Sequence, residues 1–187
     1  MKAHVFISQV IALTLLSAPA LAQGAGNTLQ LAGTTIPRCA ISNAATRTAG
    51  DALLVASSVA NSQIIFPGLA DESGFLSENT IQLTFEGVWC NKTAKFKLAS
   101  QNRGLLNPAQ ATAGYTNKVN YIASALWGGQ ITGLQLKTSD VAEAEKHSAE
   151  PYADSLIINI NTVAEAGVRL IAGDYSDVLT LSIEPDV

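Results

Sequence analysis

The clearest chemistry in the sequence belongs to its two cysteines, Cys39 and Cys90. An even number of cysteines in a chain with an export signal predicts a disulfide, because the compartments beyond the cytoplasm are oxidising. Closing a loop of about 50 residues is expected to stabilise the fold by very roughly 4 kcal/mol on the chain-entropy model. Two buried free thiols are the alternative. A metal site is disfavoured, since two isolated cysteines and His147 provide fewer ligands than a structural zinc site needs.

Catalytic residues are not indicated among the remaining polar side chains. The sequence contains no G-x-S-x-G elbow, no glycine-rich phosphate loop and no calcium-loop pattern. His147 is interpreted as a solvated loop residue. Two carboxylate pairs could do acid–base chemistry, but their polar, turn-like surroundings favour ordinary surface groups. We therefore expect a protein that is not an enzyme and needs neither cofactor nor metal. The two pairs are Glu143 with Glu145 and Asp174 with Asp177.

The first 22 residues have the layout of a cleavable signal peptide. Lys2 precedes an apolar stretch over residues 5–16, and the small residues Ala20 and Ala22 follow it. This stretch is shorter than the roughly 20 residues that span a bilayer, and no later segment is apolar enough to insert into a membrane. We expect cleavage after Ala22 and export of a soluble chain, with residues 23–187 as the mature protein.

Composition limits the possible partners. The chain has a net charge of −4, and its charged residues amount to only 14% while hydrophobic residues amount to 48%. An acidic chain of this kind is not suited to bind nucleic acid or an anionic membrane surface. The high hydrophobic content favours a folded core over disorder.

Alternation of apolar and polar residues is the dominant local pattern, and it is typical of half-buried strands. Residues 94–98 show it most clearly, with lysines on one face. Gly87 interrupts another such run, where we expect a β-bulge. The pattern predicts a single all-β sandwich. The expected strands cover residues 28–31, 81–90, 94–98, 119–123, 130–136, 155–160, 168–172 and 177–183.

Two regions do not follow this pattern. Residues 139–149 are interpreted either as a helix, with Asp140 near its start and Lys146 near its end, or as a polar loop. Residues 50–79 contain short apolar pieces between polar turns and receive no assignment.

Three stretches of the sequence resemble one known family. TLQLAGTTIPRCAIS at 28–42 resembles the start of mature spore coat protein U domains and of archaic chaperone–usher pilins. GVWCN, FKLAS and NRGL within 87–105 are similar to the second cysteine of that family and to the strand and turn behind it. AGDYSD followed by VLTLSI at 172–183 looks like its C-terminal signature.

This resemblance implies an incomplete immunoglobulin-like sandwich over residues 39–187. In the periplasm a chaperone would lend the missing strand, and the subunit would then pass to an outer-membrane usher. There the N-terminal segment of a neighbouring subunit, equivalent to residues 23–38, would replace the chaperone strand. The expected function is that of a structural subunit of a surface pilus or fimbria, with a role in adhesion or biofilm formation.

The resemblance also assigns individual residues to this assembly. We expect Leu29, Leu31 and Gly33 to form the donor strand. The acceptor groove and the chaperone-binding edge would be flanked by Leu179, Leu181 and Ile183.

Two alternatives remain open at this stage. One is a minor or tip adhesin subunit of the same fibre. The other is an exported binding module that does not polymerise, in which the region of Trp89 or Trp127 faces a ligand. Packing in the core or at its rim is the competing interpretation of both tryptophans.

Overall fold

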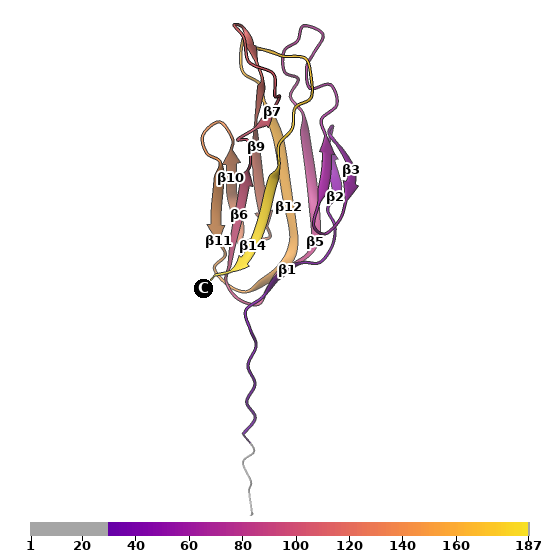
Figure 1. Ribbon diagram of the computed structural model, residues 1–187. Helices are drawn as coiled ribbons and strands as arrows, with labels where there is room; N and C mark the ends of the chain where they lie inside the picture. The colour runs from indigo at the N-terminus through magenta and orange to yellow at the C-terminus, as the bar shows by residue number, and fades with distance from the viewer. Residues whose placement is uncertain (1–29, 187) are drawn as a thin grey trace, which may run out of the picture. The chain divides into compact units, whose positions relative to one another are not determined.

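The computed structural model describes residues 30–186, and this part of the chain contains fourteen strands and no helix (Figure 1). The expectation of an all-β fold is confirmed. Between Gln30 and Asp186, therefore, no helix has the length and apolarity that crossing a membrane requires. All strands belong to the unit Thr35–Val187. The strands are β1 (Cys39–Ile41), β2 (Thr46–Gly50), β3 (Leu53–Ser57), β4 (Ser62–Ile65), β5 (Thr80–Cys90), β6 (Ala94–Ser100), β7 (Leu105–Leu106), β8 (Tyr115–Thr116), β9 (Lys118–Trp127), β10 (Ile131–Lys137), β11 (Glu143–His147), β12 (Tyr152–Val163), β13 (Arg169–Leu170) and β14 (Leu179–Pro185).

The larger sheet is antiparallel and has the strand order β1-β5-β12-β9-β10. β2 pairs with the first half of β5, and β7 pairs with the start of β9. On β12, buried Leu156, Ile158 and Ile160 alternate with half-buried Asn159 and Asn161. This alternation places one apolar face of the sheet toward the core, because successive side chains of a strand point to opposite faces.

The smaller sheet has the order β11-β6-β14, and both of its pairings are antiparallel. β6 lies at its centre, where Ala94, Phe96 and Leu98 are fully buried. Lys95 and Lys97 between them are half-buried on the other face, as the sequence pattern predicted. β14 is an edge strand of this sheet.

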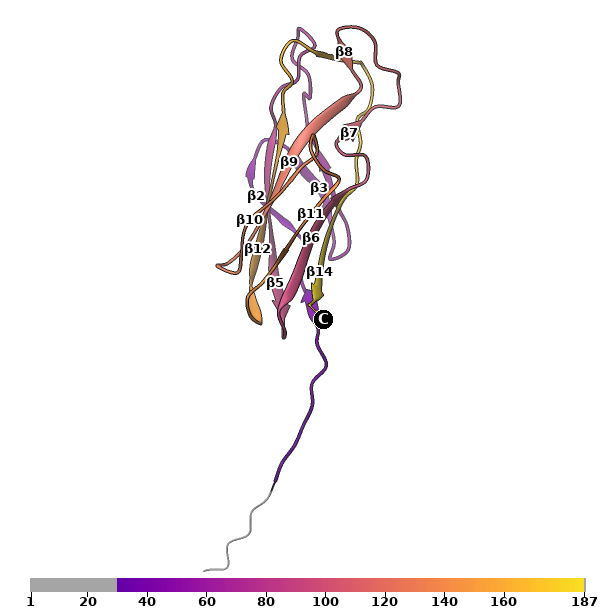
Figure 2. The same ribbon diagram turned by 90° about the vertical axis from the view of Figure 1, so that its left-hand side faces the viewer.

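One hydrophobic core joins the two sheets, whose strands are layered in the views of Figures 1 and 2. The ring of Phe96 from the smaller sheet lies 4.9 Å, centroid to centroid, from the ring of Trp127 in the larger sheet. Trp127 is fully buried, and its indole N–H donates to the carbonyl oxygen of Asp154 at 3.2 Å. The interpretation of Trp127 as a ligand-facing residue is therefore wrong. Trp89 remains 36% exposed.

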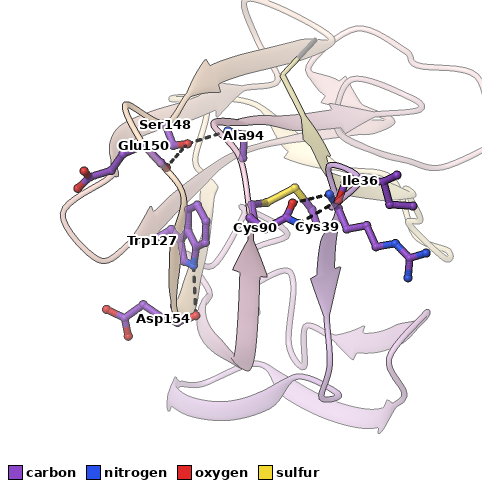
Figure 3. The surroundings of a disulfide bond; sticks show 10 residues. Ile36, Cys39, Cys90, Ala94, Trp127, Ser148, Glu150 and Asp154 are labelled. Atoms are coloured by element: carbon purple, nitrogen blue, oxygen red, sulfur yellow. Dashed lines mark hydrogen bonds between the residues drawn. A yellow bond between two sulfur atoms is a disulfide. The ribbon is translucent and has the colours of Figure 1, made fainter. Parts of the chain in front are cut away.

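The predicted disulfide is present between Cys39 and Cys90 (Figure 3). The two cysteines are directly paired across β1 and β5. The bond therefore holds the short strand β1 on the larger sheet at the end of β5.

A β-bulge at Gly87 is also confirmed. Opposite it, Asp154 pairs with Val88 and Leu156 with Phe85, so two residues of β5 face one residue of β12. Gly87 has a φ of 69°, a left-handed conformation that glycine adopts without steric cost.

The expectation of a helix or polar loop over 139–149 is wrong, because Glu143–His147 forms β11 and pairs with β6. His147 consequently lies in a strand rather than in a loop. The N–H and C=O groups along this side of β6 need partners, and a short polar strand satisfies them while facing water. Lys97 of β6 forms an ion pair with Glu143, and the hydrogen bond to Glu143 raises the pKa of Lys97.

The unassigned region 50–79 contains the hairpin β3–β4, which pairs with neither large nor small sheet. Its residues Leu54 and Ile64 pack against the core, whereas Leu53, Val55 and Ile65 are exposed. The strand expected over 168–172 is reduced to Arg169–Leu170, which pairs in parallel with β8. In the strand expected over 28–31, Gln30 and Leu31 form no strand and residues 28 and 29 lie outside the described residues.

We predict that losing the disulfide lowers the free energy of unfolding of the mature chain by up to about 4 kcal/mol, because the bond closes a loop with a sequence separation of 51. Urea unfolding of the double variant Cys39→Ser, Cys90→Ser beside the oxidised chain measures this difference. The same comparison on the double variant with and without reductant should give no difference. Equal stability of the oxidised chain and the variant would show that the bond contributes nothing.

Candidate functional site

An apolar groove of about 1210 Å³ opens between β14 and the β3–β4 hairpin. Its floor is formed by side chains of the larger sheet, from β5, β9 and β12. One wall is formed by residues 170–181, which lead into β14, and the other by residues 58–66 of the hairpin. The floor residues are Leu83, Phe85, Tyr121, Ile158 and Ile160.

The wall at β14 consists of alternating apolar residues that are only half-buried. Leu179 and Leu181 line the groove. Leu98, which pairs with Leu181 on the neighbouring strand, is fully buried. The difference arises because β6 has a strand on each side, whereas β14 has one on a single side. Ile183 packs against the core near the end of β14 but does not line the groove.

The backbone of the same residues faces the free side of β14. The N–H of Asp186 donates to the carbonyl oxygen of Thr93 at 2.7 Å, and the N–H of Gln101 donates to that of Val178 at 3.0 Å. In an antiparallel ladder the residues that bond to one neighbour alternate with those that face away from it. The even-numbered residues of β14 therefore bond to β6. The odd-numbered residues Leu179, Leu181, Ile183 and Pro185 direct their polar backbone groups to the open side.

Pro185 limits this open edge. It has a carbonyl oxygen but no N–H, so it cannot complete a hydrogen-bonded pair with an added strand. The edge thus offers complete pairs at Leu179, Leu181 and Ile183. These three residues present an apolar side chain and a free backbone acceptor and donor on one strand.

A polar network fixes the start of β14 beside the groove. The carboxylate of Asp177 accepts hydrogen bonds from the hydroxyl of Tyr121 at 2.7 Å and from the backbone N–H of Asn102 and of Val178, both at 2.8 Å. The hydroxyl of Ser100 donates to the same carboxylate. These donors come from both sheets, so Asp177 joins β14 to the larger sheet as well as to the end of β6.

The sequence-based interpretation of Asp177 as a solvated surface carboxylate is therefore wrong, although it holds for exposed Asp174. Burial raises the pKa of Tyr121, and its hydrogen bond to Asp177 raises it further, while the contact with Ser100 lowers it. Tyr121 is 3% exposed. The neutral hydroxyl is thus kept as a hydrogen-bond donor in the folded state.

His147 does not line this groove. Nδ1 of His147 lies 2.8 Å from Oδ2 of Asp186, and both side chains are partly exposed. Of the expected donor residues, Leu29 lies outside the described residues. Leu31 is 87% exposed, and a Cβ added to Gly33 would have no neighbour within 4 Å.

Sequence reasoning missed several residues of the site. Phe85 and Ile158 lay on the correct face of expected strands, but nothing in the alternation indicated that they line a groove. The run 64–66 of the hairpin was visible as an apolar piece without an assignment. Asp177 and Tyr121 are 56 positions apart, and no local pattern connects them.

Comparisons of this chain with models of protein families, with curated proteins and with solved structures find no match. The geometry of the groove and the sequence resemblance are therefore what any functional proposal rests on.

We predict that Asp177→Ala lowers the free energy of unfolding by about 2–3 kcal/mol, because several donors lose their acceptor together. Denaturant unfolding measures this effect. The matched control is Asp174→Ala, which removes an exposed carboxylate three positions away and should change stability by less than about 0.5 kcal/mol. Equal losses in the two variants would contradict the role assigned to Asp177.

We also predict a loss of stability in alkaline solution that depends on Tyr121. The pKa of Tyr121 is raised in the folded state above its unfolded value of about 10. Its contribution to the free energy of unfolding is therefore fully present below pH 10 and is lost as the pH rises toward the folded pKa. Between pH 10 and 11 this costs at most about 1.4 kcal/mol. Unfolding at both pH values should show a smaller loss for Tyr121→Phe than for the original chain, and parallel losses would contradict the prediction.

Proposed function

We propose that this chain is a structural subunit of a surface pilus or fimbria, assembled through the chaperone–usher pathway by donor-strand complementation. The observation that carries the proposal is the groove at β14, where Leu179 and Leu181 lie beside a free backbone edge. A half-exposed apolar stripe next to an unpaired strand edge promotes aggregation, so a folded chain with this feature benefits from a partner that covers both. An added β-strand does so.

In this proposal the occupant is the N-terminal segment of a neighbouring copy or related subunit. Its residues Leu29, Leu31 and Gly33 alternate with Thr28, Gln30 and Ala32. A strand with this pattern presents two leucines to an apolar groove and polar or small residues to water. The described domain would then be an immunoglobulin-like sandwich that is completed in trans.

The transit partners follow from the same resemblance. Before assembly a periplasmic chaperone covers Leu179, Leu181 and Ile183, and an outer-membrane usher then exchanges the chaperone for the next subunit. The chain is exported, and its final location is the cell surface. Its role is structural rather than catalytic, in adhesion or biofilm formation.

We predict that deleting residues 23–33 abolishes incorporation into fibres but leaves chaperone binding intact, because the groove at β14 is unchanged. Electron microscopy of surface fibres and co-purification with the chaperone measure the two properties. Incorporation of the shortened chain into fibres would contradict the assignment of the donor strand.

Two point variants test the proposal on the mature chain without deleting residues. Leu31→Lys places a charge on the face of the donor that enters the groove and should reduce oligomers in gel filtration at least tenfold. Gln30→Lys places the same charge on the opposite face and should leave assembly unchanged. Equal effects of the two variants would contradict the proposed strand insertion.

A mixing experiment separates polymerisation from simple peptide binding. Leu31→Lys impairs only the donor, and Leu181→Lys impairs only the acceptor. A mixture of both variants should form dimers but no longer assemblies. Each dimer has only one competent donor segment and one competent groove, and the two are already bound to each other. If the original chain folds alone and stays monomeric, the exported binding module is the better interpretation.

A further inference from the structure

Asn91 holds the backbone of Ile36 and Arg38 through hydrogen bonds of its side chain and its backbone. Its side-chain oxygen Oδ1 accepts from the N–H of Arg38 at 2.6 Å, and its side-chain nitrogen Nδ2 donates to the carbonyl oxygen of Ile36 at 3.0 Å. Its own backbone N–H donates to the carbonyl oxygen of Arg38 at 3.0 Å. Asn91 thus holds three backbone groups of a segment that belongs to no strand.

These bonds lie directly beside the disulfide. Figure 3 shows Ile36 next to the bond between Cys39 and Cys90, and Asn91 is the residue after Cys90. Between Ile36 and Arg38 lies Pro37, whose ring fixes φ and which favours an extended conformation at the preceding residue. Residues 36–39 are therefore restrained by a covalent bond, a proline ring and the side chain of Asn91.

We propose that Asn91 is a positioning residue, which fixes the direction in which the N-terminal segment leaves the domain. This inference rests on the proposed function, because the direction matters when the segment enters the groove of a neighbouring subunit. If Gly33 is the last donor residue and Ile36 is held by Asn91, only Thr34 and Thr35 remain free. The distance from Gly33 to Ile36 is then at most roughly 11 Å, or three extended residue steps.

A tether of this length restricts how two subunits are arranged. The domain that donates the strand must lie directly at the end of the groove it fills. Its orientation is limited by a segment whose base does not rotate freely. Without the side chain of Asn91 the first restrained backbone group is the carbonyl of Arg38, which still accepts from the backbone N–H of residue 91. The tether then gains Ile36 and Pro37, although the proline ring still limits rotation there. The fibre would then bend more easily at every junction.

The chemistry of this position requires an amide side chain. Asn91 accepts with one atom and donates with the other, and no carboxylate does both when ionised. Asn91→Asp keeps the size and the acceptor for Arg38 but places an oxygen against the carbonyl oxygen of Ile36. Asn91→Ala removes both side-chain bonds. Lys92→Ala is the matched control in the same turn, because the Lys92 side chain forms no hydrogen bond or ion pair with any residue between 30 and 186.

The first measurement is hydrogen–deuterium exchange of the mature chain over residues 36–39, read at the Arg38 amide. This amide should exchange about tenfold faster in Asn91→Ala than in the original chain or in Lys92→Ala, with Asn91→Asp between them. Stability in urea should change little, which separates positioning from folding. Unchanged exchange at Arg38 in Asn91→Ala would overturn the inference without touching the proposed function.

The second measurement is the bending of fibres in electron micrographs. We expect fibres of Asn91→Ala to form and to have a persistence length at least twofold shorter than those of the original chain and of Lys92→Ala. Fibres with unchanged persistence length, despite faster exchange at Arg38, would overturn the positioning role. Absence of fibres from the original chain would instead contradict the proposed function, and the positioning role with it.

Discussion

The organisation of this domain depends on the position of β14 as an edge strand with a hydrogen-bonded neighbour on one side. β6 satisfies half of its backbone groups, and the other half face outward beside an apolar stripe. Each feature alone is common in β proteins, because edge strands and partly exposed leucines occur in most of them. Their combination on Leu179 and Leu181, above the floor of the larger sheet, creates a surface that offers an added strand both apolar contacts and backbone hydrogen bonds.

Periodicity predicted the central strands because their burial is one-sided. In β6, Phe96 packs into the core and Lys97 lies on the opposite face, so apolar and polar residues alternate in the sequence. β11 gives no such signal, since Glu143 and His147 are polar wherever they lie. It becomes a strand because β6 leaves hydrogen-bonding groups on that side, and this demand comes from the tertiary fold rather than from local sequence.

The candidate site was less accessible to sequence reasoning for a related reason. The inward phase of Phe85 follows from alternation, but the absence of a covering strand depends on how many neighbours β14 acquires, and no single segment encodes that number. Asp177 gave the opposite error. In a polar turn it resembled a solvated group, whereas its hydrogen bonds to Ser100 and Tyr121 depend on residues that only folding brings near. These hydrogen bonds fix one wall of the groove within the folded chain itself.

The alternation on β14 also limits the registers in which an added strand could pair with it. Leu179, Leu181 and Ile183 each supply both an apolar side chain and unpaired backbone groups. If an added strand shifted along this edge, its side-chain contacts and its hydrogen bonds would therefore change together. A shift of one residue turns the wrong face inward. Tolerable errors are therefore restricted to shifts of two residues, about 7 Å each. Because Pro185 ends the pairing edge on one side, an added strand would have only a few alternative registers, each well separated from the next.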